Sequence, residues 1–374
     1  MNNASNRERA LIDRAVDLLA TEYEQQSEFN EYFDADEPIA IGQLTYPRSK
    51  VLYWVDRDAY AAERTAWQDD LYETKHEAAR RLIAENQYEH RFADLLQAIA
   101  RGRVVPFVGA GLSAPCGMPL WGDALNLLLT RLVPPDAEAI RANIANGQYL
   151  QAAQALAAHD NPQTANFIST TYRLRELRLA GPVTLLPKLT HGCIVTTNFD
   201  DAIEKTYELA DMRFEHYMHG AQDHNFFSRM LRGDRCILKL HGDAESRATH
   251  ILTREQYDQA YGHPFDFSRP LPRALRQIYL SQSLLFLGCA LEQDLTMELF
   301  TAAMEAGGFE VPAHYALLPS PADEAARRQK EARLVRLNIQ PLWYPVGAAG
   351  THEAVQQLLE LALDVNQRRV TFAV

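Results

Sequence analysis

Long apolar runs and a signal peptide are both absent from this sequence of 374 residues. No stretch approaches the roughly 18 to 20 consecutive apolar residues that a helix needs to span a bilayer. The N-terminus lacks the basic and apolar regions that mark secreted chains. These absences predict a cytoplasmic protein with no membrane segment.

Positive charge is in deficit, because 37 Lys and Arg stand against 49 Asp and Glu, for a formal net charge of −12. This balance argues against a uniform nucleic-acid-binding surface and leaves a local basic groove open. The basic clusters at 327–330 and 368–369 are short, and such clusters are typical of solvated helix faces. Contact with nucleic acid is therefore expected only indirectly, through a partner.

Cysteine is scarce, and no Cys-x-x-Cys pair occurs. Four cysteines are scattered along the chain: Cys116, Cys193, Cys236 and Cys289. A Cys₄ zinc site needs paired ligands at short spacing, so this distribution predicts no zinc. We expect the four thiols to be reduced and to behave as small apolar core residues.

The most informative stretch runs from Val104 to Ser113, with the sequence VVPFVGAGLS. A short apolar run that ends in glycine predicts a buried parallel strand, followed by a tight turn and a helix. This unit is typical of a phosphate cradle, in which backbone N–H groups and a helix N-terminus face an anion. Glycine turns after buried strands also serve packing alone, so both interpretations stay open at this point.

Further strand-like runs alternate with helical patterns over the rest of the chain. The runs lie at 193–197, 214–218, 236–240, 284–287, 314–318 and 339–344. The alternation predicts an α/β fold with a Rossmann-like parallel sheet and helices on both faces. Residues 123–190 are helical in pattern, with a final helix at 164–177, and are expected to be an insertion between the first two strands.

Residues 1–100 carry no chemical motif and are expected to be mostly helical. Within them, Glu31–Glu37 reads as irregular, and the apolar patch Val51–Val55 predicts a strand or a buried turn. Such a front end is an oligomerisation or partner surface, or a packing layer. Residues 347–374 are expected to form a C-terminal helix and tail.

Polar or small residues follow four of the predicted strands. The strand ends read GAGLS from Gly109, TTNFD from Thr196, KLHGD from Lys239 and GCALEQD from Gly288. In open α/β sheets, ligands bind beyond the carboxyl ends of the strands. Any one of these ends is explained by structure alone, for example Asn198 and Asp200 as caps of a helix at 202–209. Their convergence in one sheet predicts a site.

The order of these motifs resembles the sirtuin-like NAD-binding fold over residues 101–346. The sequence GMPLW at 117–121 and the motif TTNFD look closer to the bacterial anti-phage defence branch than to the deacylating one. Deacylating sirtuins carry a zinc ribbon with two Cys-x-x-Cys pairs, which this chain lacks. The motif Pro-Asp-Phe-Arg of their loop is also missing, since Leu120, Trp121 and Gly122 follow Pro119.

The resemblance implies roles for individual residues. The catalytic set would be Asn198, which orients water and ribose hydroxyls, His241 as a general base, and Asp200, which orients the carboxamide or braces the loop. Cofactor-binding positions would be Gly109, Ala110, Gly111, Ser113, Thr197, Gly288 and Cys289.

The function that the resemblance implies is hydrolysis of NAD⁺ to ADP-ribose and nicotinamide, with NAD as substrate, in anti-phage defence by NAD⁺ depletion. It also implies a homo-oligomer and activation in a complex with a co-encoded partner such as a HerA-type ATPase. The alternatives are a regulatory subunit that binds NAD or ADP-ribose without turnover, and an NAD-dependent protein deacylase.

Overall fold

The structure is a computed structural model that describes residues 2–173, 178–292, 295–308, 310–348 and 350–372. The chain divides into two compact units, Met1–Glu77 and Ala78–Val374. Among the described residues, no helix combines the length and the hydrophobicity that crossing a bilayer requires.

The first unit is a helical region with a small aromatic core. It contains α1 (Asn2–Glu24), α2 (Ser27–Phe33), a hairpin of β1 (Ile39–Ile41) and β2 (Leu44–Tyr46), α3 (Arg48–Val55) and the first part of α4 (Arg57–Glu85). Phe29, Tyr53 and Tyr60 form its core, and the Tyr53 hydroxyl donates to the carbonyl of Leu19.

Two expectations for this unit were wrong. Val51–Val55 lies in helix α3, because an apolar run of five residues does not by itself distinguish a helix from a strand. Part of the stretch 31–37 is also helical, since α2 extends to Phe33. The hairpin of β1 and β2 was not predicted from the sequence.

The second unit is built on a seven-stranded sheet in which every strand pair is parallel. The spatial order is β5-β6-β4-β3-β7-β8-β9. The strands are β3 (Val104–Val108), β4 (Ile194–Thr196), β5 (His216–His219), β6 (Cys236–Lys239), β7 (Ser283–Leu287), β8 (His314–Pro319) and β9 (Ile339–Tyr344). The expected α/β class and all seven predicted strands are confirmed.

Strand β3 lies in the centre of the sheet, and its five side chains are all buried. From β3 the chain adds β4, β5 and β6 on one side and then crosses to the other side for β7, β8 and β9. Connections that leave in opposite directions place helices on opposite faces and open a crevice at the carboxyl edge. The reversal falls between β3 and β7.

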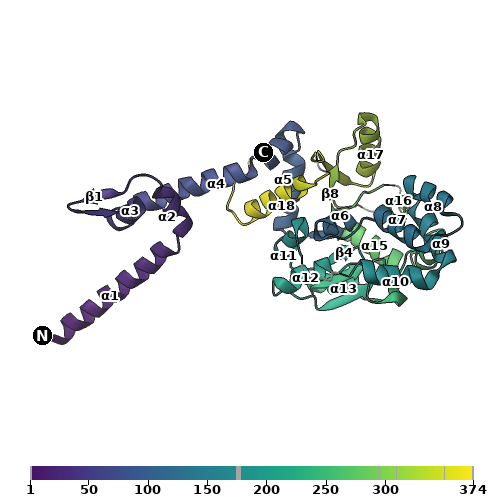
Figure 1. Ribbon diagram of the computed structural model, residues 1–374, viewed down its shortest axis with the longest axis horizontal. Coiled ribbons are helices and arrows are strands. Elements are labelled where there is room, and N and C mark those ends of the chain that lie inside the picture. The colour runs from purple at the N-terminus through teal and green to yellow at the C-terminus, as the bar shows by residue number, and fades with distance from the viewer. Residues whose placement is uncertain (1, 174–177, 293–294, 309, 349, 373–374) are drawn as a thin grey trace. The chain divides into compact units, whose positions relative to one another are not determined.

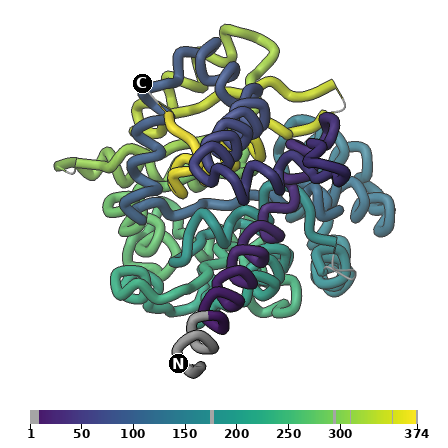
Figure 2. The backbone as a smooth tube through the Cα atoms, turned by 90° about the vertical axis from the view of Figure 1, so that its left-hand side faces the viewer, coloured from purple at the N-terminus to yellow at the C-terminus, as the bar shows by residue number. Residues whose placement is uncertain are grey.

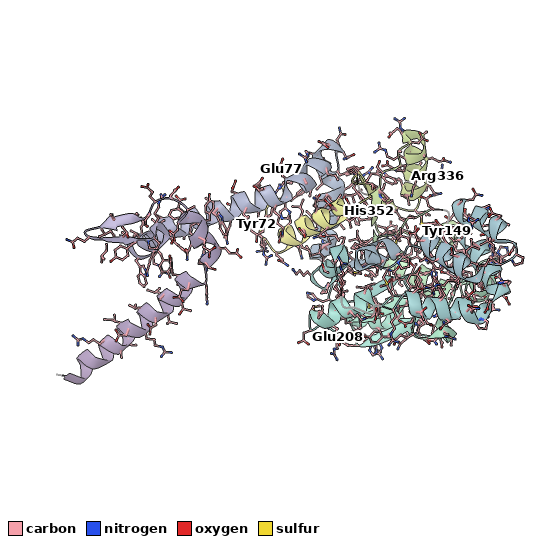
Figure 3. The ribbon with its side chains drawn as sticks, viewed as in Figure 1. Tyr72, Glu77, Tyr149, Glu208, Arg336 and His352 are labelled. Atoms are coloured by element: carbon pink, nitrogen blue, oxygen red, sulfur yellow. The ribbon has the colours of Figure 1, made fainter. Side chains whose placement is uncertain are left out.

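Further helices of the second unit precede, connect or follow these strands (Figure 1). They are α5 (Glu89–Ala100), α6 (Ala110–Ser113), η1 (Ala114–Cys116), η2 (Gly181–Leu185), α11 (Leu186–Leu189), α12 (Ala202–Leu209), α13 (Phe226–Arg232), η3 (Arg247–Thr249), α14 (Arg254–Tyr261), α15 (Pro270–Ser281), α16 (Leu295–Glu305), α17 (Glu324–Arg336) and α18 (Glu353–Asn366). Figure 3 labels Glu208 near the end of α12 and His352 just before α18.

The helical insertion between β3 and β4 is present as expected. It contains α7 (Trp121–Leu132), α8 (Ala137–Ala145), α9 (Tyr149–His159) and α10 (Asn161–Thr171), which gather in one group drawn in blue to teal (Figures 1 and 2). The last helix ends at Thr171, and residues 174–177, also predicted to be helical, lie outside the described residues. Tyr149, labelled in Figure 3, begins α9.

The insertion has its own hydrophobic core, which also takes in Phe199 from the loop after β4. The Phe199 ring lies 5.8 Å from the Trp121 ring and 5.7 Å from the Tyr172 ring, between centroids. The insertion therefore packs directly against the loop that carries Asn198.

Candidate active site

Four strand ends meet at the carboxyl edge of the sheet, because β6, β4, β3 and β7 are consecutive neighbours. All ten predicted site residues lie in the loops after these strands. Five of them are buried: Gly109, Ser113, Asn198, Asp200 and His241. Five are partly exposed: Ala110, Gly111, Thr197, Gly288 and Cys289. The polar side chains therefore lie beneath a rim of small residues.

A hydrogen-bond network joins the loops after β3 and β4. Asn198 Nδ2 donates to the carbonyl of Gly109 at 3.2 Å and to Ser113 Oγ at 3.1 Å. The Ser113 hydroxyl in turn donates to Asp200 Oδ1 at 3.0 Å. The last residue of β4 also holds this loop in place. Thr196 Oγ1 accepts a hydrogen bond from the backbone N–H of Asn198 and donates one to the carbonyl of Val108 on β3.

The side-chain oxygen of Asn198 has no hydrogen-bond partner, although it is fully buried. An unsatisfied buried polar group costs about 1–3 kcal/mol and is uncommon in native proteins. A ligand hydroxyl or a water molecule that donates to Oδ1 would remove this cost. The orphaned oxygen therefore marks a candidate binding position at this loop.

Asp200 braces the loop after β4 and the start of α12, whereas its orienting of the carboxamide stays a prediction. Its Oδ1 accepts from Ser113 and also from the backbone N–H of Ala202, at the start of α12. Burial raises the pKa of the Asp200 carboxyl, and the nearby Lys239 ammonium acts in the opposite direction.

His241 is buried in the loop after β6 and is surrounded by hydroxyl groups. Its Nε2 lies 3.1 Å from the Tyr257 hydroxyl and 3.3 Å from the Tyr261 hydroxyl. The imidazole is also hydrogen-bonded to the backbone of Thr197. Burial lowers the pKa of His241 to about 4, so the ring is neutral at physiological pH and has a nitrogen that can accept a proton.

The glycines after β3 and β7 lie against each other. The N–H of Gly109 donates to the carbonyl of Leu287 at 2.9 Å, and that of Gly111 donates to the carbonyl of Gly288 at 3.0 Å. A Cβ on Gly109 would lie 2.5 Å from the Gly288 oxygen, and one on Gly288 would lie 2.2 Å from the backbone nitrogen of Leu112. The glycines therefore allow the two turns to pack, as the packing interpretation of this stretch expects.

Several residues around the site were not singled out from the sequence. Tyr257 and Tyr261 come from α14, and nothing in their spacing distinguishes them from ordinary core residues. Lys239 does carry a signal, because it is a charged residue within the apolar run 236–240. Its ammonium group is buried among acceptors from three segments of the chain.

All four cysteines are unbridged, as expected. Three are buried, whereas Cys289 is partly exposed. In the described ranges, one group of possible metal ligands comes together, namely Glu215, His216 and Asp234. It lies where β5 and β6 begin, at the opposite edge from Asn198, and Asp234 is already paired with Arg229.

The described residues also form an open groove of about 770 Å³ near α14 and α9. It is lined by Gln154, Arg254, Glu255, Asp258, Gln259 and Arg269. None of these residues belongs to the network around Asn198 and His241. The groove is therefore separate from the site at the strand ends.

Comparison with known proteins finds similarity to SIR2-like domains. Residues 192–342 match the family of SIR2-like domains. The chain is also 31% identical, over 192 residues, to the NAD(+) hydrolase ThsA of Acinetobacter baumannii. That alignment covers 49% of this chain and 35% of the relative, so the chain spans about a third of the relative's length.

The family match begins just before β4 and ends within β9, so it includes the loops that carry Asn198, Asp200 and His241. Strand β3, with Gly109 and Ser113, precedes the match but pairs with β4 and β7 in the same sheet. Over residues 192–342 the chain is therefore similar to SIR2-like domains.

Proposed function

We propose that this protein hydrolyses the nicotinamide–ribose bond of NAD⁺, giving ADP-ribose, nicotinamide and a proton. The observation that carries the proposal is the unpartnered Oδ1 of Asn198 at the carboxyl edge of a SIR2-like sheet. The 31% identity to an NAD(+) hydrolase supports the same reaction.

The chemistry suits the groups that are present. Cleavage of the bond builds positive charge on the ribose, in an oxocarbenium-like transition state of the kind seen in glycoside hydrolysis. Nicotinamide departs as a neutral molecule, so the leaving group needs little acid assistance. The chain must hold the ribose and direct one water molecule to its anomeric carbon.

Asn198 Oδ1 would accept a hydrogen bond from a ribose hydroxyl or from the attacking water. Its amide nitrogen is held by Gly109 and Ser113, so the oxygen has a fixed direction. Ser113 would act through Asn198, because its hydroxyl proton is directed to Asp200.

His241 would accept the proton that the water releases. A base with a pKa of about 4 is weak, but water that attacks an oxocarbenium-like carbon becomes strongly acidic as the new bond forms. The neutral imidazole is therefore basic enough for this late proton transfer.

The dinucleotide would lie over the rim formed by the turns after β3, β4 and β7. Ala110, Thr197 and Cys289 are partly exposed there. Gly109 and Gly288 pack against each other in this rim, so a side chain at either position would displace the turns that the pyrophosphate and the adenosine half would contact.

We place this activity in anti-phage defence by NAD⁺ depletion, with the protein acting as a homo-oligomer or together with a co-encoded partner such as a HerA-type ATPase. The first unit supports a role in assembly, since Leu11, Leu18, Leu44 and Val55 each expose more than half of their surface. Purification of the chain alone and with the product of its neighbouring gene would show whether a partner is required.

The test of the function is to incubate the purified chain, with and without that partner, with NAD⁺ and to separate the products by chromatography. We expect nicotinamide and ADP-ribose in equal amounts. Asn198→Ala should abolish their release, and Glu31→Ala, at an exposed position of the first unit, should not. Products that form equally fast with Asn198→Ala would contradict the proposal.

One observation favours a second candidate, a subunit that binds NAD or ADP-ribose without turnover. His241 is buried and its pKa lies well below neutrality, which limits its strength as a base. Calorimetry with NAD⁺ separates the two candidates, because a regulatory subunit would show saturable binding with no nicotinamide released under any condition.

A further inference from the structure

The side chain of Lys239 is an ammonium group in the interior of the second unit, with 1% of its surface exposed. It follows Leu238 on β6, and its Nζ lies among four oxygen acceptors. The distances from Nζ are 2.6 Å to the carbonyl of Asp200, 2.7 Å to Asp243 Oδ2, 2.8 Å to Glu204 Oε1 and 3.2 Å to the carbonyl of Phe199.

Three of these acceptors come from the two loops that carry the proposed catalytic groups, and the fourth, Glu204, lies on α12. Phe199 and Asp200 directly follow Asn198 in the loop after β4. Asp243 comes two residues after His241 in the loop after β6. The loops also touch through one backbone hydrogen bond, from the N–H of Ala244 to the carbonyl of Phe199. One ammonium group therefore holds both loops at once.

Two carboxylates face the buried lysine, and burial raises the pKa of one of them, Glu204, despite the attraction of Lys239. Burial by itself lowers the pKa of the Lys239 ammonium, but attraction to Glu204 and Asp243 outweighs it, so the pKa is raised and the group stays charged. Burial alone would raise the pKa of Asp243, yet the attraction of Lys239 leaves it lowered. A persistent ion pair in a dry interior keeps one geometry because any displacement leaves a charge uncompensated.

We propose that Lys239 is a positioning residue that fixes Asn198 relative to His241, an inference that rests on the proposed hydrolysis of NAD⁺. Lys239 acts through the backbone of the loop after β4 and through the Asp243 carboxylate, and it does not itself contact the substrate. A misplacement of about 1 Å between an orienting amide and a base costs on the order of a hundredfold in rate.

The test compares the intact chain with the double variant Lys239→Met with Glu204→Gln. The double change removes the buried lysine together with its more deeply buried carboxylate partner, while Asp243 keeps access to solvent with 22% of its side chain exposed. Lys188→Met, at an exposed position of α11, is the control for the same substitution.

Two readouts are measured on each variant that keeps a cooperative thermal transition. Hydrogen–deuterium exchange follows peptides that cover 197–203 and 241–246, with β8 as an internal reference. Steady-state kinetics of nicotinamide release separates kcat from KM. We expect exchange to be about tenfold faster in the two loops and unchanged in β8, with kcat lower by about tenfold or more and KM for NAD⁺ changed less.

Wild-type exchange in both loops, or a wild-type kcat in the folded double variant, would overturn the inference. If the double variant does not fold, Asp243→Asn tests the inference instead. This change weakens the contact of Lys239 with the loop of His241 only, so exchange should become faster in 241–246 alone. If the intact chain releases no nicotinamide, the proposed function fails, whereas the exchange data still decide whether Lys239 holds the two loops.

Discussion

The hydroxyl of Ser113 donates a hydrogen bond to Oδ1 of Asp200 across 3.0 Å, at a position with no exposed surface. A serine hydroxyl has one proton to donate, so this bond leaves Ser113 Oγ only as an acceptor, and Asn198 Nδ2 donates a hydrogen bond to it. Ser113 therefore links the loops after β3 and β4 through two hydrogen bonds.

Ser113→Ala should lower nicotinamide release by about tenfold, because Asn198 loses one of its two anchors. Asp200 also loses a donor, so the pKa of its carboxyl, already raised by burial, should rise further. Product chromatography and a thermal melt check the prediction, with Ser268→Ala on the exposed surface as the matched control. Unchanged turnover would show that Gly109 alone orients the amide.

Asn198→Ala should lower turnover strongly and unfolding free energy only slightly. The amide oxygen is unpartnered in the free protein, so removing it relieves a cost that partly offsets the loss of the two donated hydrogen bonds. We expect a loss of unfolding free energy of only about 1 kcal/mol, together with a fall in turnover of about a hundredfold or more. Denaturant unfolding and product assays give both values, and a large destabilisation would contradict this account.

Acid should destabilise the second unit through two buried imidazoles. Burial lowers the pKa of His241 to about 4 and that of His314 to about 3, against about 6.5 in an unfolded chain. Below pH 6.5 the unfolded state binds more protons than the native state, so stability falls as the pH is lowered towards these values.

His314→Asn tests this relation away from the site. His314 Nδ1 accepts from the backbone N–H of Leu284, and an asparagine oxygen can do the same without titrating. Between pH 6 and pH 4.5 the slope of unfolding free energy against pH should be smaller in the variant by about 1.4 kcal/mol per pH unit. Identical slopes would mean that His314 is protonated in the native state.

Tyr257→Phe removes the hydroxyl that lies 3.1 Å from His241 Nε2 and keeps the aromatic ring. The imidazole would then be held by Tyr261 and by Thr197, so we expect kcat to fall by about three- to tenfold with little change in KM. Tyr344→Phe, which loses a hydrogen bond to His352 far along the chain, is the control. An equal effect of both changes would point to general loosening.

Gly288→Ala should be strongly destabilising, because Gly288 has a φ of +67° and its new Cβ would lie 2.2 Å from the backbone nitrogen of Leu112. Gly233→Ala supplies a matched comparison, since φ is +82° there and no atom lies within 4 Å of the added carbon. We expect about 1 kcal/mol for Gly233→Ala from backbone strain alone and about 3 kcal/mol or more for Gly288→Ala. Similar values from thermal or denaturant unfolding would refute the packing role.

The sequence predicted the sheet well because most of its strands contain a short apolar run bounded by polar or glycine residues. The strand ends around Gly109, Asn198, His241 and Gly288 followed directly, since parallel strands present their carboxyl ends at one edge. The roles of the individual residues at that edge could not be predicted from the sequence. Ser113 donates a hydrogen bond to Asp200, and the N–H of Gly109 donates to the carbonyl of Leu287. Both contacts depend on the distance between loops, which only packing determines.

Other features left too little signal in the sequence. The three-residue strands β1 and β2 are shorter than any pattern of period two can reveal. Tyr257 and Tyr261 are spaced like core residues of any amphipathic helix. Lys239 could be noticed as a charge in an apolar strand, but its partners lie on three segments that become neighbours only in the folded unit.

The order in which the chain is synthesised has a bearing on this site. Ser113 and Asp200 are 87 positions apart, and Cys289 reaches back 182 positions to the carbonyl of Phe107. Contacts of such long sequence separation form late, after the loops between them have closed. A ribosome-bound chain that has not yet released β7 lacks the support for Gly109, so the proposed site can form only after residues 283–289 have emerged.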